Sequence, residues 1–172
     1  MKTLIISIIL TSIFYYSNGQ SYNSFKISPP VNANQLNSDS VKREEEKSFG
    51  LKSSNMRELI PRYYYAVGDI TVGYWVLKVR KEAQRSREQA AKELKVTYSG
   101  MSQVPPDIYV KSYNGISYVI NKYQLSGKGQ ITFFSDYVND QAICGVVKFD
   151  PADKQKAERI TESLLNGIRL NN

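Results

Sequence analysis

The chain has 172 residues, with 23 Lys and Arg against 16 Asp and Glu, one Cys and no His. This length suits one domain of about 100–150 residues with flanking segments. The composition excludes a Ser-His-Asp triad, a Cys-His pair, an internal disulfide and the usual zinc or iron–sulfur sites, so we expect no metal and no cofactor. The one thiol, Cys144, lies in a strand-like apolar run and is expected to be a small buried side chain.

The first twenty residues are typical of a secretory signal peptide. Lys2 gives a positive start, an apolar run covers residues 4–10, and small polar residues follow at 17–20. The apolar run is shorter than the ~20 residues that span a bilayer, although an uncleaved signal anchor is the alternative. We expect residues 1–20 to be removed and the mature protein to be exported, either to the periplasm or out of the cell.

Residues 21–58 have a polar composition and no apolar periodicity. Residues 21–38 are rich in Ser and Asn and contain Pro29-Pro30, and a charged run follows at 42–47. Such a composition is typical of a flexible spacer. The sequence therefore predicts three parts: a signal peptide (1–20), a polar flexible N-terminal segment (21–58) and a folded domain (59–172).

The folded part begins with a predicted hairpin, followed by a helix. The turn-forming pair Gly68-Asp69 separates the aromatic run 63–65 from the alternating run 70–77, which favours two paired strands. Small apolar residues at spacings of three and four predict a helix over 80–94. Residues 96–98 suit a brief edge strand in the connection that follows.

From residue 107 onward the pattern predicts a four-strand meander and a closing helix. Asn114-Gly115 lies between alternating runs and indicates a tight hairpin, because both residues accept the positive φ of a type I′ turn. Asp150 as N-cap and Pro151 at the first helical position are typical of a helix start. The whole order predicts an α+β fold, in which an antiparallel sheet is covered by a middle helix and a C-terminal helix.

Three local patterns within this order carry a resemblance to a known family. They are Tyr113-Asn114-Gly115, Gln-Ile-Thr-Phe-Phe at 130–134, and Cys-Gly-Val-Val-Lys-Phe at 144–149 before the closing helix. With the order of elements, they make residues 70–170 similar to the PsbP-like group of α/β domains, which includes DcrB-like envelope proteins. The resemblance implies an accessory or binding protein, and it supplies no catalytic residues.

A basic stretch is the first candidate for a binding surface. Residues 78–95 hold seven Lys and Arg against three Glu. On a helix, four of these basic side chains fall near one face: Lys78, Lys81, Arg85 and Lys92. Such a face suits an anionic surface such as lipid headgroups, although a solvated helix face is the ordinary alternative.

Aromatic side chains are the second candidate. Tyr63, Tyr65 and Trp75 lie close together in the sequence, and the chain has 13 Tyr in all. Aromatic rings with polar tips suit contacts with a ligand or a protein. Ordinary packing under the helices is the alternative for these three residues.

These features favour an exported, non-catalytic binding or accessory protein of the bacterial cell envelope. Its expected partner is an envelope protein, an anionic surface or a small ligand between sheet and helix, and export argues against nucleic acid. One alternative is a hydrolase that uses carboxylates or Tyr, which a pocket with two carboxylates of raised pKa would indicate. A structural envelope protein that associates with itself is the other.

Overall fold

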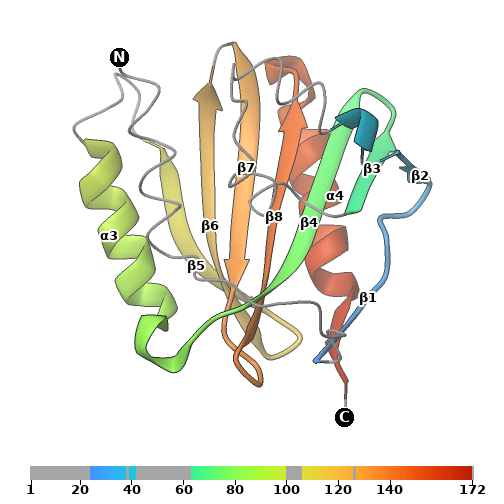
Figure 1. Cartoon of the computed structure of the whole chain (residues 1–172). Coiled ribbons are helices and arrows are strands. Elements are labelled where there is room, and N and C mark those ends of the chain that lie inside the picture. Colours follow the sequence, from blue (N-terminus) through green and yellow to red (C-terminus); the bar gives the residue numbers. More distant parts are fainter. Residues whose placement is uncertain (1–23, 38, 42–62, 100–105, 126, 172) are drawn as a thin grey trace.

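The main feature of the molecule is a seven-stranded antiparallel sheet, in the order β2-β3-β4-β8-β7-β6-β5 (Figure 1). The computed structural model describes residues 24–37, 39–41, 63–99, 106–125 and 127–171. The strands are β1 (Phe25–Ile27), β2 (Asn34–Gln35), β3 (Tyr63–Val67), β4 (Ile70–Lys78), β5 (Asp107–Tyr113), β6 (Ile116–Leu125), β7 (Lys128–Ser135), β8 (Gln141–Phe149) and β9 (Ile168–Leu170). Two helices have both ends in the described part of the chain, α3 (Arg87–Ser99) and α4 (Lys154–Gly167), and 3-10 turns lie before them at Lys81–Ala83 and Pro151–Asp153. Residues 39–41 are also helical.

The α+β fold predicted from the sequence is confirmed. The hairpin of β3 and β4 is followed by α3, the meander of β5 to β8 and the closing helix α4. Asn114 and Gly115 make the turn between β5 and β6, with φ values of 52° and 77°. The Asn114 amide donates to the backbone oxygens of Asn166 (2.8 Å) and Ile168 (3.3 Å), so this turn is tied to the end of α4.

The main core lies between α4 and one face of the sheet. Successive residues of a strand point to opposite faces, so each strand contributes every second side chain to this layer. From α4, Ala157, Leu164 and Leu165 are buried against the strands. Each fully buried large apolar side chain contributes about 1.5–3 kcal/mol. The strand residues of the core include Ile70, Val72, Val76, Ile116, Tyr118, Ile120, Ile131, Phe133, Ile143 and Val147.

The second helix, α3, covers the opposite face of the sheet at the β5–β6 end (Figure 1). Its buried contact is a small cluster of Ala91 with Ile108 and Val119. Among the apolar side chains of α3 only Ala91 is buried, so this layer buries less apolar surface than the main core does under α4. No helix in the described part of the chain is long and apolar enough to cross a membrane.

Part of the segment predicted to be flexible is structured. Within residues 21–58, β1 pairs with β9 and β2 pairs with β3. Phe25 is buried against the main core, which gives this short polar stretch an apolar anchor. The predicted signal peptide (1–20) lies outside the described residues, and so does the predicted domain boundary at residue 59.

The middle helix begins later than the sequence predicted. It was expected over 80–94, whereas α3 runs from Arg87 to Ser99 and includes the residues 96–98 that suited an edge strand. Ser86 sets the start: its Oγ accepts a hydrogen bond from the Gln89 backbone N–H (3.1 Å), as an N-cap does. Residues 79–86 form a connection that contains only the 3-10 turn.

Asp150 takes the predicted N-cap position, but it precedes the 3-10 turn and not α4 itself. Its side chain makes no capping hydrogen bond and instead pairs with Lys128, the first residue of β7. Pro151 does begin a helical turn, but that turn is 3-10 and α4 starts only at Lys154. Pro151 fits there because its fixed φ suits a helical turn and its missing N–H costs nothing at a helix start.

Candidate functional site

A groove of about 280 Å³ lies between α4 and the end of the sheet formed by β5 and β6. Its floor is apolar, with Ile120 and Ile131, and Tyr109 and Tyr113 form the wall on the side of the sheet. The α4 wall is polar. The full lining is Tyr109, Tyr113, Ile120, Lys122, Ile131, Gln155, Glu158, Arg159, Thr161 and Glu162.

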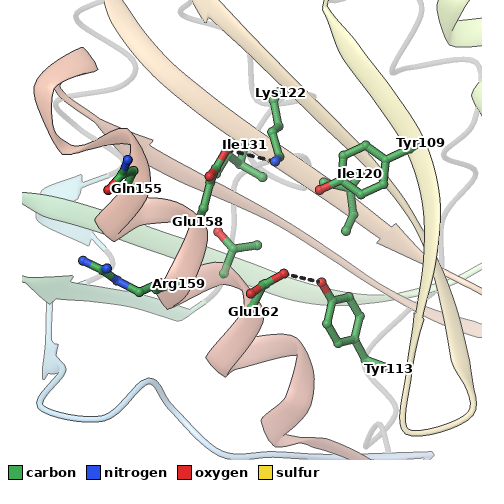
Figure 2. Close-up of a pocket in the computed structure, with 10 residues that line it drawn as sticks. Tyr109, Tyr113, Ile120, Lys122, Ile131, Gln155, Glu158, Arg159 and Glu162 are labelled. Carbon is green, nitrogen blue, oxygen red and sulfur yellow. Dashed lines mark hydrogen bonds and ion pairs between the residues drawn. The ribbon is translucent and has the colours of Figure 1, made fainter.

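The periodicity of the elements brings these side chains together. Tyr109 and Tyr113 lie four residues apart on one strand, so both face α4. Glu158 and Glu162 lie one turn apart on α4, and Figure 2 shows both pointing from the helix toward the strands. Because β5 is the last strand of the sheet, the groove lies at the sheet edge.

The inner ion pair of the groove joins Lys122 to Glu158, with 2.9 Å between Nζ and Oε1. These side chains are 24% and 32% exposed, and the ammonium also lies 5.2 Å from the centroid of the Tyr109 ring. Burial disfavours the charged Lys122, but its hydrogen bonds and electrostatic attraction to Glu158 and Tyr109 together outweigh burial and raise its pKa above the ordinary value. Lys122 therefore stays charged and held in place.

The outer ion pair joins Lys111 to Glu162, with 2.8 Å between Nζ and Oε1. The Tyr113 hydroxyl donates to the same carboxylate oxygen at 3.4 Å, and the Lys111 ammonium lies 5.0 Å from the centroid of that ring. The hydrogen bond from Lys111 lowers the pKa of Glu162, and the same bond raises the pKa of Lys111. Burial raises the pKa of Tyr113.

These shifts decide what the groove can do chemically. A general acid or base works best with a pKa near the operating pH. The pKa of Glu162 is lowered, while the pKa values of Lys111, Lys122 and Tyr113 are raised. Each of these pKa values is therefore shifted further from pH 7. Within the described ranges, no three His, Cys, Asp or Glu side chains gather to hold a metal ion. The arrangement is suited to binding through fixed charges and an apolar floor.

The three aromatic residues singled out in the sequence do not share one surface. Tyr63 pairs opposite Tyr74, so Tyr63 and Tyr65 face the α4 side of the sheet and Trp75 faces the other side. The Tyr74 ring stacks on those of Tyr63 and Tyr65, at centroid distances of 5.2 and 5.8 Å. Tyr65 and Trp75 are buried, whereas Tyr63 is 46% exposed. None of the three lines the groove.

The four basic residues do not lie on one helix face, because α3 begins only at Arg87. Lys78 ends β4, and Lys81 lies in the 3-10 turn. Arg85 belongs to the connection, where its backbone N–H donates to the Tyr137 hydroxyl (3.4 Å), and only Lys92 belongs to α3. All four are exposed, so their contact with an anionic partner stays a prediction.

The sequence pointed to a ligand between sheet and helix but identified none of the residues that line the groove. Two signals were available: the carboxylates of Glu158 and Glu162 at helical spacing, and Tyr109 and Tyr113 on one face of a predicted strand. Neither signal says that the helix face and the strand face meet. That depends on how α4 is laid across the sheet.

No protein-family model and no curated protein matches the chain. Among solved structures, the chain is similar to the solution structure of a cyanobacterial PsbP (CyanoP) from Synechocystis sp. PCC 6803. The identity is 6% and the TM-score 0.47, and the similarity covers 91% of this chain and 98% of that one. The chain thus resembles a PsbP structure, as its order of elements predicted. At this identity and TM-score no site residue is transferred from it.

Proposed function

We propose that this protein is a non-catalytic binding protein, exported to the envelope of a bacterium, which holds its ligand in the groove between α4 and β5–β6. One observation carries the proposal: the groove combines an apolar floor with two ion pairs that fix its polar rim. In these ion pairs the pKa of Lys122 is raised and that of Glu162 is lowered, so both lie further from pH 7. Such groups are better suited to binding than to proton transfer.

The groove suits a small amphipathic ligand. Its volume lies near the lower end of the roughly 300–1,000 Å³ typical of small-molecule sites. A groove of this size also suits one large side chain of a partner protein. An apolar part would rest on Ile120 and Ile131. A polar part would use the hydrogen-bonding positions that the ion pairs leave open, since an ammonium has three donors and a carboxylate accepts several hydrogen bonds.

The proposed destination is supported by the signal-peptide pattern at residues 1–20, which favours export to the periplasm or out of the cell. An envelope protein or an anionic surface is the second candidate partner, favoured by the exposed Lys78, Lys81, Arg85 and Lys92. Of the aromatic residues predicted to bind, Tyr63 is the one with an exposed ring. Nucleic acid is not an expected partner of an exported protein.

The groove is tested with substitutions that remove its wall or its inner charge. Mature chain (residues 21–172) would be incubated with a small-molecule extract and a detergent extract of its own envelope, and the retained molecules identified by mass spectrometry. Tyr109→Ala and Glu158→Gln should reduce their retention at least tenfold, because each removes a contact at the groove. Glu88→Gln, an exposed carboxyl on α3, is the matched control.

Tyr63→Ala separates the groove from the surface predicted by the sequence. If the groove binds the ligand, Tyr63→Ala retains the same molecules as the wild type. Retention that is lost in Tyr63→Ala and kept in Tyr109→Ala would move the site to the surface around Tyr63 on β3. Equal retention in all variants would show that neither surface is the binding site.

A further inference from the structure

The two edges of the seven-stranded sheet are unlike each other. One edge is β2, which has only two residues, whereas the other is β5, which has seven. In the described part of the chain, β5 pairs on one side only, with β6. The backbone groups on the outer side of a long edge strand are a template for pairing with another strand.

The register of the hairpin shows which backbone groups face outward. Tyr113 and Ile116 close the two-residue turn, and the closing pair of such a turn is a hydrogen-bonded pair. The odd-numbered residues of β5 therefore direct their N–H and C=O groups toward β6. Ile108, Val110 and Ser112 direct theirs away from the sheet.

We propose that β5 pairs antiparallel with β5 of a second copy of this chain, about a two-fold axis at Tyr109. A two-fold interface must be complementary to itself. In this register Asp107 of each copy lies opposite Lys111 of the other, which gives two pairs of opposite charge. In the single chain Lys111 also pairs with Glu162, and Asp107 lies 4.0 Å from the Lys122 ammonium. The Asp107 and Lys111 side chains are nevertheless 67% and 48% exposed, so each has free surface at the edge.

The apolar residues and the hydrogen bonds fit the same register. Ile108 of each copy lies opposite Val110 of the other, and both are outward-facing positions that would exchange hydrogen bonds. Their side chains lie on the α3 face, where Ile108 already packs with Ala91 and Val119. The apolar cluster under α3 would thus continue from one copy into the next.

A competing register is less favourable. An axis at Val110 also satisfies the hydrogen-bond pattern, but it places Lys111 opposite Tyr109 and Asp107 opposite Tyr113. Opposite charges facing each other across strands stabilise a pair, and the Tyr109 axis alone provides them. It also sets the two Tyr109 side chains, and hence the two grooves, beside each other, although the proposal does not depend on a groove ligand.

The dimer is tested by sedimentation equilibrium of the mature chain. A contact between two edge strands is small, so we expect a weak dimer with a Kd on the order of 10–100 µM. Val110→Pro removes an outward N–H and leaves the bonds to β6 in place, as proline at a strand edge does. The loss of this donor in both copies should raise the Kd at least tenfold.

Charge reversal tests the register without changing the backbone. Lys111→Asp and Asp107→Lys should each raise the Kd at least tenfold, because like charges then face each other. An equimolar mixture of the two variants should restore a heterodimer near the wild-type Kd, since each cross-strand pair is again of opposite charge. Lys92→Asp on α3 is the matched control and should leave the Kd unchanged. A chain that stays monomeric to about 1 mM, a dimer indifferent to these substitutions, or a mixture that does not associate would each overturn the proposal.

Discussion

Arg87 is the most completely buried charged side chain in the described ranges, with 2% of the residue exposed. Its guanidinium carbon lies 4.6 Å from the ring centroids of both Phe134 and Tyr137. Its Nε lies 3.2 Å from Oδ1 of Asp136, and Nη2 donates to the backbone oxygen of Arg85. Arg87 therefore joins the first turn of α3 to the end of β7 and the turn that follows it.

Arg87→Met should destabilise the protein by roughly 1–3 kcal/mol, because it removes the ion pair and the contacts with two rings. The lower end takes account of Asp136, whose side chain is 44% exposed and can be solvated when unpaired. Arg85→Met is the matched control, since Arg85 is exposed, and should change stability by no more than about 0.5 kcal/mol. Urea denaturation of both variants measures the difference. If Arg87→Met changed the free energy of unfolding no more than Arg85→Met does, the buried guanidinium would add nothing to stability.

The loss of stability in mildly alkaline solution is expected to begin with buried groups that ionise there. Burial raises the pKa of the Cys144 thiol and of the Tyr118 phenol. The unfolded forms lose their protons first, at about pH 8.5 for a thiol and about 10 for a phenol. Above these values the unfolded chain binds fewer protons than the folded one, so stability falls as the pH rises.

We expect the free energy of unfolding to decline from about pH 8.5 in the wild type, and more steeply above about pH 10. Cys144→Ala should remove the first part of the decline and keep the second, which belongs to the tyrosines together with Lys111 and Lys122, whose pKa values are also raised in the folded state. Urea denaturation at pH 7, 9 and 10.5 measures both parts of the decline. A decline near pH 9 that persists in Cys144→Ala would show that the thiol is not its source.

Among the elements, the hairpins could be predicted because their turns are encoded locally. Asn114-Gly115 and Gly68-Asp69 both lie where the sequence placed turns, and Asn114, Gly115 and Gly68 have positive φ in the structure. Such residues favour a turn whatever the rest of the chain does. Predictions that rest on this chemistry were therefore confirmed.

The start of α3 could not be predicted in this way, because contacts from distant residues decide it. The backbone N–H of Val79 donates to the carbonyl of Asp140 (2.6 Å), and the Gln84 amide donates to the Asp140 carboxylate (2.9 Å). These bonds hold the connection in a non-helical path until Ser86 caps the helix. The spacing of small apolar residues over 80–94 was real, but tertiary contacts overrode it.

The groove could not be predicted either, because it too depends on contacts between distant residues. The sequence predicted α4, β5 and β6 correctly, and each already carried its share of the groove residues. The ion pairs of Lys122 with Glu158 and of Lys111 with Glu162 join positions 36 and 51 residues apart. Which strand residue meets which helix turn follows from the packing of α4 on the sheet, and no local pattern encodes it.

At the scale of the whole molecule, the start and the end of the folded part are joined. β1 pairs with β9, with Phe25 opposite Leu170 and Ile27 opposite Ile168. The Asn171 backbone N–H donates to the carbonyl of Ser24 at 3.0 Å, which extends the pairing by one residue. The sequence missed this pairing because β1 is short and is surrounded by polar residues, so it carries no periodic signal.

Phe25→Ala tests whether this junction stabilises the fold. Phe25 is 7% exposed and packs against the main core, so its truncation should cost roughly 3–5 kcal/mol. Lys26→Ala is the matched control on the same strand, because Lys26 is exposed and should change stability by no more than about 0.5 kcal/mol. Urea denaturation of mature chain measures both. If the two variants were equally stable, β1 would contribute nothing to the domain, and residues 24–27 would behave as the flexible spacer that their composition predicted. A difference of the expected size would place the beginning of the domain at β1, only a few residues after the predicted signal cleavage site.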